Sequence, residues 1–264
     1  MQDQGTSNFP WRHGVFVTLC AISLMGAVAI FGQLVVGSVV NLLVSTLTPE
    51  YVNSLKTPMG EVLVSSVAYI VAGGAAILLG WSWCGGGSLL TMVGGEPRIF
   101  REKFVSNMGY ALRGYGLMFG IVLVVMISMT LLLPHGIDIK PTDNASEFAK
   151  TLHGWPMILF AVQSVILAPF FEEFLCRGLM YNMLRSGVLA NWGKYVSENV
   201  ATIYGIGMSA FYFAAMHMSL TGMLVLFPAG IAFAVVYRRS GNIYASIQMH
   251  MIMNLIATIA AALH

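Results

Sequence analysis

The sequence predicts an all-α, polytopic membrane protein of about seven transmembrane helices. Of its 264 residues, 57% are hydrophobic and only 9% are charged. That hydrophobic share exceeds the roughly 45 to 50% that is usual for soluble globular domains. A helix that spans a bilayer needs about 20 mostly apolar residues, and the apolar runs of this chain reach that length. We therefore expect a single membrane domain over residues 1–264.

Seven apolar runs, separated by polar or charged segments, are the candidate spans. The first follows a polar start and is longer than one span, so we expect a retained anchor rather than a removed signal peptide. The segment 84–113, with glycines and mixed charges, is predicted to be a linker with an interfacial helix. Only residues 219–222 are available for a turn between the fifth and sixth runs. The runs are 14–47, 62–83, 115–133, 155–171, 201–218, 220–237 and 243–263.

The basic residues predict an orientation in the membrane. Lys and Arg accumulate in short cytoplasmic loops. With seven spans, the side of the N-terminus holds ten of the 13 basic residues, and the other side holds Lys56, Lys140 and Lys150. We therefore expect a multi-pass protein, in a bacterial-type plasma membrane, with a cytoplasmic N-terminus and an external C-terminus.

Composition and missing motifs exclude several classes of function. The net charge of +2 and the scattered basic residues exclude nucleic acid as a partner. The chain has three cysteines, Cys20, Cys84 and Cys176, which form no CxxC pair and no metal-ligand spacing. We therefore expect them to serve as small apolar residues in the membrane core. The chain has no HExxH and no GxSxG, which argues against a helical zincin and a serine nucleophile elbow. Its aspartates lie only in polar segments, which excludes an intramembrane aspartyl dyad.

Two adjacent carboxylates, Glu172 and Glu173, follow the fourth apolar run, and Arg177 lies four residues after the second. Charged side chains in hydrocarbon cost free energy and are rare unless they are paired, face a cavity or have a function. Residues four apart share a helix face, so we expect an ion pair between Glu173 and Arg177. Glu172 is rotated by about 100° and is left to accept a proton from water or to bind a metal. The alternative is that these charges only mark a helix end at the level of the lipid headgroups.

Two further polar sets lie inside later apolar runs. Phe213 and His217 are one helical turn apart, and His250 and Asn254 repeat this spacing in the last run. A lone histidine on an apolar helix is more often a packing residue. Amide and imidazole groups in a bilayer nevertheless need polar partners, and the nearest available ones are each other and Glu172. We therefore expect these groups to converge in a polar cavity inside the bundle.

One glutamate, two histidines and an asparagine are a sufficient set for the hydrolysis of an amide bond. Glu172 suits a general base that acts on water, and the histidines can orient that water or carry a proton to the leaving amine. The amide of Asn254 can donate to the oxyanion of the tetrahedral intermediate, where one donor is worth on the order of 3 kcal/mol. Alternatively, Glu172, His217 and His250 can ligate a zinc ion, which lowers the pKa of its bound water to about 7. The sequence therefore leaves two alternatives for the cofactor, a divalent metal such as zinc or none.

In this order and on separate apolar helices, the three motifs resemble those of the CAAX-protease and bacteriocin-processing (CPBP) family, also called the Abi group of intramembrane proteases. The resemblance covers residues from about 155 to 264, which we take as the catalytic core, and the N-terminal half matches only as apolar spans. The family carries EExxxR, FxxxH and HxxxN/D, matched here by Glu172 and Glu173 with Arg177, Phe213 with His217, and His250 with Asn254.

The resemblance implies a role for each matched residue. Glu172 would be the base that activates water, and His217 and His250 would position or polarise water and substrate. Asn254 would form the oxyanion hole. The supporting residues would be Glu173, Arg177 and Phe213.

We therefore predict a CAAX-type intramembrane endopeptidase, dependent on a glutamate or a metal, that cleaves a membrane-associated peptide or protein. By resemblance, the substrate is either a prenylated CAAX-type protein or a leader peptide. The alternatives are a non-catalytic immunity or scaffold protein of the same family and an ion-coupled transporter. The transporter is disfavoured because the two halves of the chain lack corresponding spans interrupted by Gly or Pro.

Overall fold

The computed structural model describes residues 9–47, 52–85, 88–132 and 144–263. Within these ranges the regular structure is entirely helical, which confirms the predicted all-α class. In chain order the elements are α1 (Val15–Leu47), α2 (Val52–Leu55), α3 (Pro58–Trp83), α4 (Leu89–Met92), α5 (Pro97–Leu132), α6 (Asn144–Ala149), α7 (Trp155–Val162), η2 (Gln163–Leu167), α8 (Ala168–Glu173), η3 (Phe174–Tyr181), α9 (Asn182–Trp192), α10 (Glu198–Met216), α11 (Met223–Ser240) and α12 (Ile243–Ala262).

Six helical segments in the described part of the chain are long and apolar enough to cross a membrane. They account for six of the seven predicted spans. The remaining one, the fifth, is the 19-residue helix α10, which is not among the six. The chain is therefore a polytopic α-helical membrane protein, and the predicted number of about seven spans is close to the number found.

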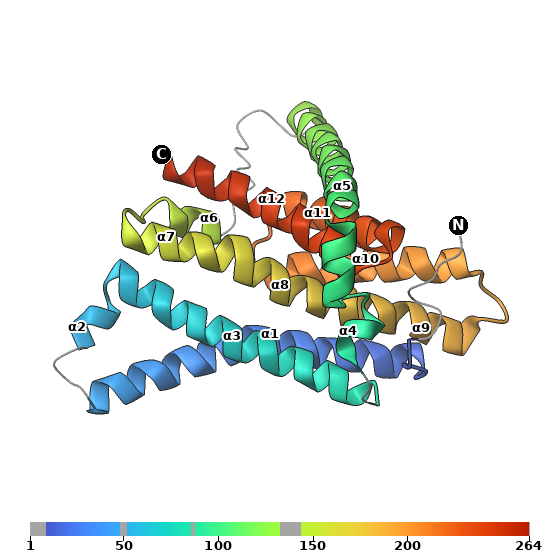
Figure 1. Ribbon diagram of the computed structural model, residues 1–264, viewed down its shortest axis with the longest axis horizontal. Coiled ribbons are helices and arrows are strands. Elements are labelled where there is room, and N and C mark those ends of the chain that lie inside the picture. Colours follow the sequence, from blue (N-terminus) through green and yellow to red (C-terminus); the bar gives the residue numbers. More distant parts are fainter. Residues whose placement is uncertain (1–8, 48–51, 86–87, 133–143, 264) are drawn as a thin grey trace.

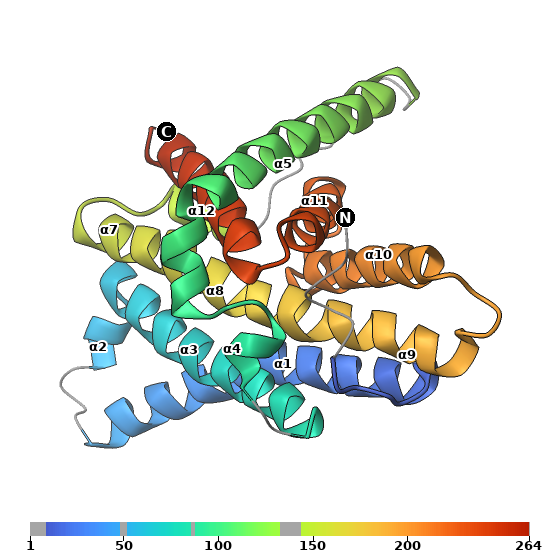
Figure 2. The same ribbon diagram turned by 45° about the vertical axis from the view of Figure 1, so that its right-hand side comes forward.

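The linker predicted over residues 84–113 is shorter than expected, because α5 begins at Pro97 and is 36 residues long. Proline is favoured in the first turn of a helix, where its missing N–H would have no partner anyway. Between α3 and α5, the described residues form only the single helical turn α4. Figures 1 and 2 both show that the C-terminal half of α5 projects away from the other helices. This half is the predicted third span, whose last residue, Leu133, lies outside the described residues.

The fourth predicted span continues far beyond residue 171. From Trp155 to Trp192, five elements follow one another as one helical segment, which crosses the centre of the bundle (Figure 1). Two of them, η2 and η3, are π-helical. This geometry is rare in proteins as a whole, but where it occurs it is often at a functional site. Asn182, the first residue of α9, donates through its side-chain Nδ2 to the carbonyls of Arg177 and Gly178 in η3, at 3.2 and 2.9 Å. The motif with two glutamates therefore lies in the middle of a helical segment and does not mark a helix end.

Small residues allow α1, α3 and η3 to approach one another closely. A Cβ on Gly32 of α1 would lie 3.0 Å from the Cβ of Ala72 on α3. A Cβ on Gly80 of α3 would lie 2.7 Å from Met25 Cε and 2.9 Å from Leu179 Cδ1. Helices in a bilayer associate through such close packing, because lipid tails are as apolar as the side chains. The α1–α3 pair thereby lies against the helical segment that carries the two glutamates.

A second close approach joins α10 and α11. A Cβ on Gly230 of α11 would lie 2.9 Å from both the Cα and the Cβ of Ala210 on α10. The carbonyl of Gly230 also accepts a hydrogen bond from Arg177 at 3.0 Å. The spacing of α10 and α11 therefore determines where this acceptor lies.

We expect Gly230→Ala to lower the thermal unfolding midpoint of the purified protein in detergent. The added methyl group has no space against the backbone of α10, and overpacking of this kind costs about 1–3 kcal/mol. Gly207→Ala on α10 is the control, because a Cβ there would meet nothing within 4 Å. A midpoint for Gly230→Ala equal to that of the control would contradict the close contact between the two helices.

Candidate active site

A cavity of about 530 Å³ lies within the bundle, in the size range of small-molecule and peptide sites. Its wall combines residues of α1, α3, α8, α11 and α12 with the C-terminal end of α10. The four side chains that the sequence analysis expected to converge, Glu172, His217, His250 and Asn254, all line it. Most of the other lining residues are apolar. The cavity therefore brings together polar groups from three separate helical segments.

Glu173 and Arg177 form the ion pair that their spacing predicts. Arg177 Nη1 donates to Glu173 Oε1 at 2.9 Å, and both side chains are fully buried. Arg177 Nη2 donates to the carbonyl of Gly230. The guanidinium carbon lies 4.7 Å from the ring centroid of Phe213 and 5.0 Å from that of Phe233. A cation–π contact of a desolvated cation is worth about 2 kcal/mol, so this buried charge is stabilised from several sides.

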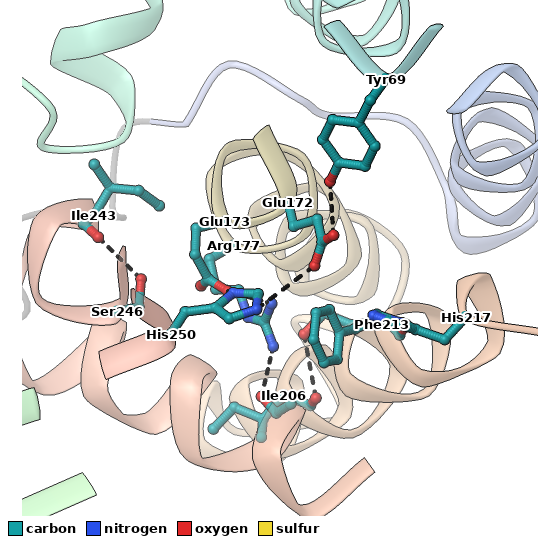
Figure 3. Close-up of polar contacts among 12 residues, drawn as sticks. Tyr69, Glu172, Glu173, Arg177, Ile206, Phe213, His217, Ile243, Ser246 and His250 are labelled. Atoms are coloured by element: carbon teal, nitrogen blue, oxygen red, sulfur yellow. Dashed lines mark hydrogen bonds and ion pairs between the residues drawn. The ribbon is translucent and has the colours of Figure 1, made fainter. Parts of the chain in front are cut away.

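His250 is oriented by Glu173 and by two aromatic rings. Its Nδ1 lies 3.0 Å from Glu173 Oε1, and because a carboxylate only accepts, Nδ1 carries the hydrogen. In the neutral ring Nε2 is then an acceptor, and it lies 3.7 Å from Glu172 Oε2 (Figure 3). The imidazole stacks on Phe233 at 4.6 Å and meets Phe213 edge to face at 5.5 Å. Glu173 therefore determines both the tautomer and the orientation of this histidine.

Glu172 is turned away from the ion pair and faces the cavity, as the helical geometry predicts. Its side chain is 16% exposed, whereas that of Glu173 is fully buried. Its Oε1 accepts a hydrogen bond from the hydroxyl of Tyr69 at 2.6 Å (Figure 3). No donor within the described ranges forms a hydrogen bond with its Oε2. The two oxygens of this carboxylate thus differ, because one is held and the other is available.

His217 directly follows Met216, the last residue of α10, and caps the helix. Its Nδ1 lies 2.8 Å from the carbonyl oxygen of Phe213, so Nδ1 carries the hydrogen and Nε2 remains an acceptor. The ring of Phe213 contacts His217 at 4.9 Å as well as His250 and Arg177. The phenylalanine one turn before the histidine is therefore the common packing surface of three charged or titratable groups.

Asn254 has a partner that the sequence did not indicate. Its Nδ2 donates to the backbone carbonyl of Ser164, in the π-helical segment η2, at 2.7 Å. The expected partners were the imidazoles and Glu172. One of the two N–H groups of Asn254 is therefore engaged, and a role as donor to an oxyanion requires the other.

Tyr69 and Gln163 are among the polar groups of the cavity that were not predicted from the sequence. Tyr69 lies on α3, and Gln163 lies 2.9 Å from the hydroxyl of Ser66, also on α3. The N-terminal spans were considered only as apolar runs. A tyrosine and a pair of serines inside the run 62–83 also need partners in a bilayer, and this signal was available in the sequence.

The side chains do not fit the zinc alternative. No group of three His, Cys, Asp or Glu residues in the described parts of the chain is arranged to hold a metal ion. Glu172 and His250 face each other at 3.7 Å, and His217, whose Nε2 is also an acceptor, is not grouped with them as a third ligand.

Comparison with known proteins gives a match to a family model. The model of a protein family described as type II CAAX prenyl endopeptidase Rce1-like matches residues 154–256. No curated protein and no solved structure matches the chain. The matched range extends from α7 into α12 and contains all three motifs, and it leaves out α1, α3 and α5.

We expect Arg177→Met to destabilise the protein by about 3–5 kcal/mol, because it leaves the Glu173 carboxylate buried without its cation. The matched control is Arg98→Met. Arg98 also pairs with a glutamate four residues away, Glu102, at 2.9 Å, but both side chains are exposed. Such a pair contributes about 0–1 kcal/mol. Thermal unfolding in detergent measures both variants, and equal losses would contradict the importance of the buried pair.

Proposed function

We propose, on the premise that residues 154–256 match the model of the Rce1-like type II CAAX prenyl endopeptidase family, that this chain is an intramembrane endopeptidase whose base is Glu172. The observation that carries the proposal is the pair of facing acceptors in the cavity wall. Glu172 Oε2 has no hydrogen-bond donor among the described residues and lies 3.7 Å from His250 Nε2. A multi-pass membrane protein with such a cavity suits the cleavage of a membrane-associated peptide or protein.

In the proposed reaction, one water molecule is held by two hydrogen bonds, which it donates to Glu172 and to His250. Glu172 removes a proton as the water oxygen forms a bond with the carbonyl carbon of the substrate, so the water O–H bond breaks. The same carboxyl then donates this proton to the amide nitrogen as the C–N bond breaks. The products are a new carboxyl terminus and a free amine, and Glu172 is again ionised.

The negative charge that develops on the carbonyl oxygen requires a donor in the cavity wall. The second N–H of Asn254 supports this role, since its first is already bound to Ser164. The Nε2 of His217 supports the positioning of the substrate, because it is an acceptor suited to an amide N–H. Glu173 and Arg177 do not line the cavity, and in this proposal they act only by holding His250.

The mostly apolar wall suits either of two substrate classes, a prenylated CAAX-type protein or a leader peptide. In this proposal both are membrane-associated chains, whose apolar groups such a wall can contact. The proposal includes an N-terminus on the cytoplasmic side, for which the distribution of Lys and Arg remains the support.

We expect Glu172→Gln to reduce peptide cleavage about 10²- to 10⁴-fold, because the amide cannot accept a proton from water. The assay uses purified protein in liposomes with a panel of prenylated CAAX peptides and leader peptides. Glu61→Gln is the control, since Glu61 is an exposed residue in the first turn of α3 and does not line the cavity. Undiminished cleavage by Glu172→Gln would refute the assignment of the base.

Direct activation of water by Glu172 also predicts that cleavage survives removal of metals. We expect dialysis against a strong chelator to leave kcat unchanged, because the described residues offer no three-ligand site. A loss of activity that added zinc restores would contradict this mechanism and would favour the metal-dependent alternative.

A further inference from the structure

The hydroxyl of Tyr69 makes the only hydrogen bond that the described residues offer to the side-chain carboxylate of Glu172. It donates to Oε1 at 2.6 Å, a short distance typical of a hydroxyl that is bound to a charged oxygen. Figure 3 shows the tyrosine reaching the carboxylate from a helix other than those of His250 and His217. Tyr69 belongs to α3, which lies outside the range that matches the family model.

The packing of α3 determines where this hydroxyl lies. The ring of Tyr69 meets Phe171 edge to face at 6.0 Å, and Phe171 directly precedes Glu172. One turn further along α3, a Cβ on Gly73 would lie 3.3 Å from the Phe171 ring. The absence of a side chain at Gly73 therefore lets α3 approach α8 closely enough for the tyrosine to reach the carboxylate.

Holding one oxygen of a carboxylate determines the direction of the other. A glutamate side chain has three rotatable bonds, and its terminal torsion is broad and weakly restrained on its own. With Oε1 bound to Tyr69, Oε2 faces His250 Nε2 at 3.7 Å. The other groups around this carboxylate are His217 across the cavity and the ion pair of Glu173 with Arg177 on its own helix. Among the described residues, Tyr69 alone donates a hydrogen bond to it.

We propose that Tyr69 is a positioning residue for Glu172, and that α3 is therefore a working part of the active site. The phenol hydrogen holds Oε1, so that Oε2 is the oxygen presented to His250 and to water. The effect of Tyr69 on the rate of cleavage rests on the proposed function. Its effect on the orientation of the Glu172 carboxylate does not.

Tyr69→Phe removes only the hydroxyl and keeps the ring against Phe171. We expect kcat to fall about 10- to 100-fold, the range given by loss of one hydrogen bond to a charged group, with KM within twofold of the wild-type value. The matched control is Tyr212→Phe. Tyr212 also hydrogen-bonds through its hydroxyl, to Ser23 at 3.0 Å, and joins α10 to α1 without lining the cavity. An unchanged kcat for Tyr69→Phe, or an equal loss in the control, overturns the proposal.

An infrared measurement tests the same contact without any substrate. The difference spectrum between wild-type protein and Glu172→Gln isolates the carboxylate stretching bands of Glu172. A second difference spectrum is taken between Tyr69→Phe and the double variant that also carries Glu172→Gln. We expect the carboxylate bands of Glu172 to be shifted in it, because Oε1 has lost its hydrogen-bond donor. Unshifted bands overturn the proposal even if cleavage is affected. If wild-type protein cleaves no peptide of the panel, the proposed function fails and these spectra still decide the role of Tyr69.

Discussion

The buried ion pair of Glu173 and Arg177 is the interaction on which the rest of the site depends. An arginine inside an apolar bundle is tolerated only when its charge is compensated. Here the carboxylate of Glu173, the carbonyl of Gly230 and two phenylalanine rings provide that compensation. These partners come from α8, α10 and α11, and Glu173 also binds His250 on α12. One desolvated cation thus fixes the relative positions of four helices around the cavity.

The two adjacent glutamates lie in different environments although they are neighbours in the chain. The side chain of Glu173 is fully buried, and its Oε1 is shared between a guanidinium and an imidazole. Glu172 faces the cavity, where one of its oxygens is held by Tyr69 and the other is free of donors among the described residues. A turn of about 100° per residue is sufficient to separate them in this way. On the proposed assignment, the fully buried carboxylate orients the histidine and the one that faces the cavity reacts with water.

Much of this arrangement could be predicted from the sequence, because charge in an apolar run is costly and helical spacing is regular. The ion pair and the convergence of Glu172 with His250 follow from those two rules. The contact of Asn254 with Ser164 does not, because it depends on a backbone carbonyl in a π-helical segment, and π-helical register leaves no periodic signal in the sequence. The same holds for Gly230, which acts through its carbonyl. Tyr69 was missed for another reason, since its span was considered only as an apolar run although a tyrosine in a bilayer also needs a polar partner.

The central claim, that the two carboxylates have separate roles, is tested most directly by comparing Glu172→Gln and Glu173→Gln in the same preparation. Thermal unfolding in detergent and peptide cleavage are measured for both variants. The account predicts that Glu172→Gln unfolds close to the wild-type temperature and is inactive. It predicts that Glu173→Gln is destabilised by about 3–5 kcal/mol, because Arg177 then remains buried without a counter-charge. Equal stability of the two variants, or full cleavage by Glu172→Gln, would contradict it.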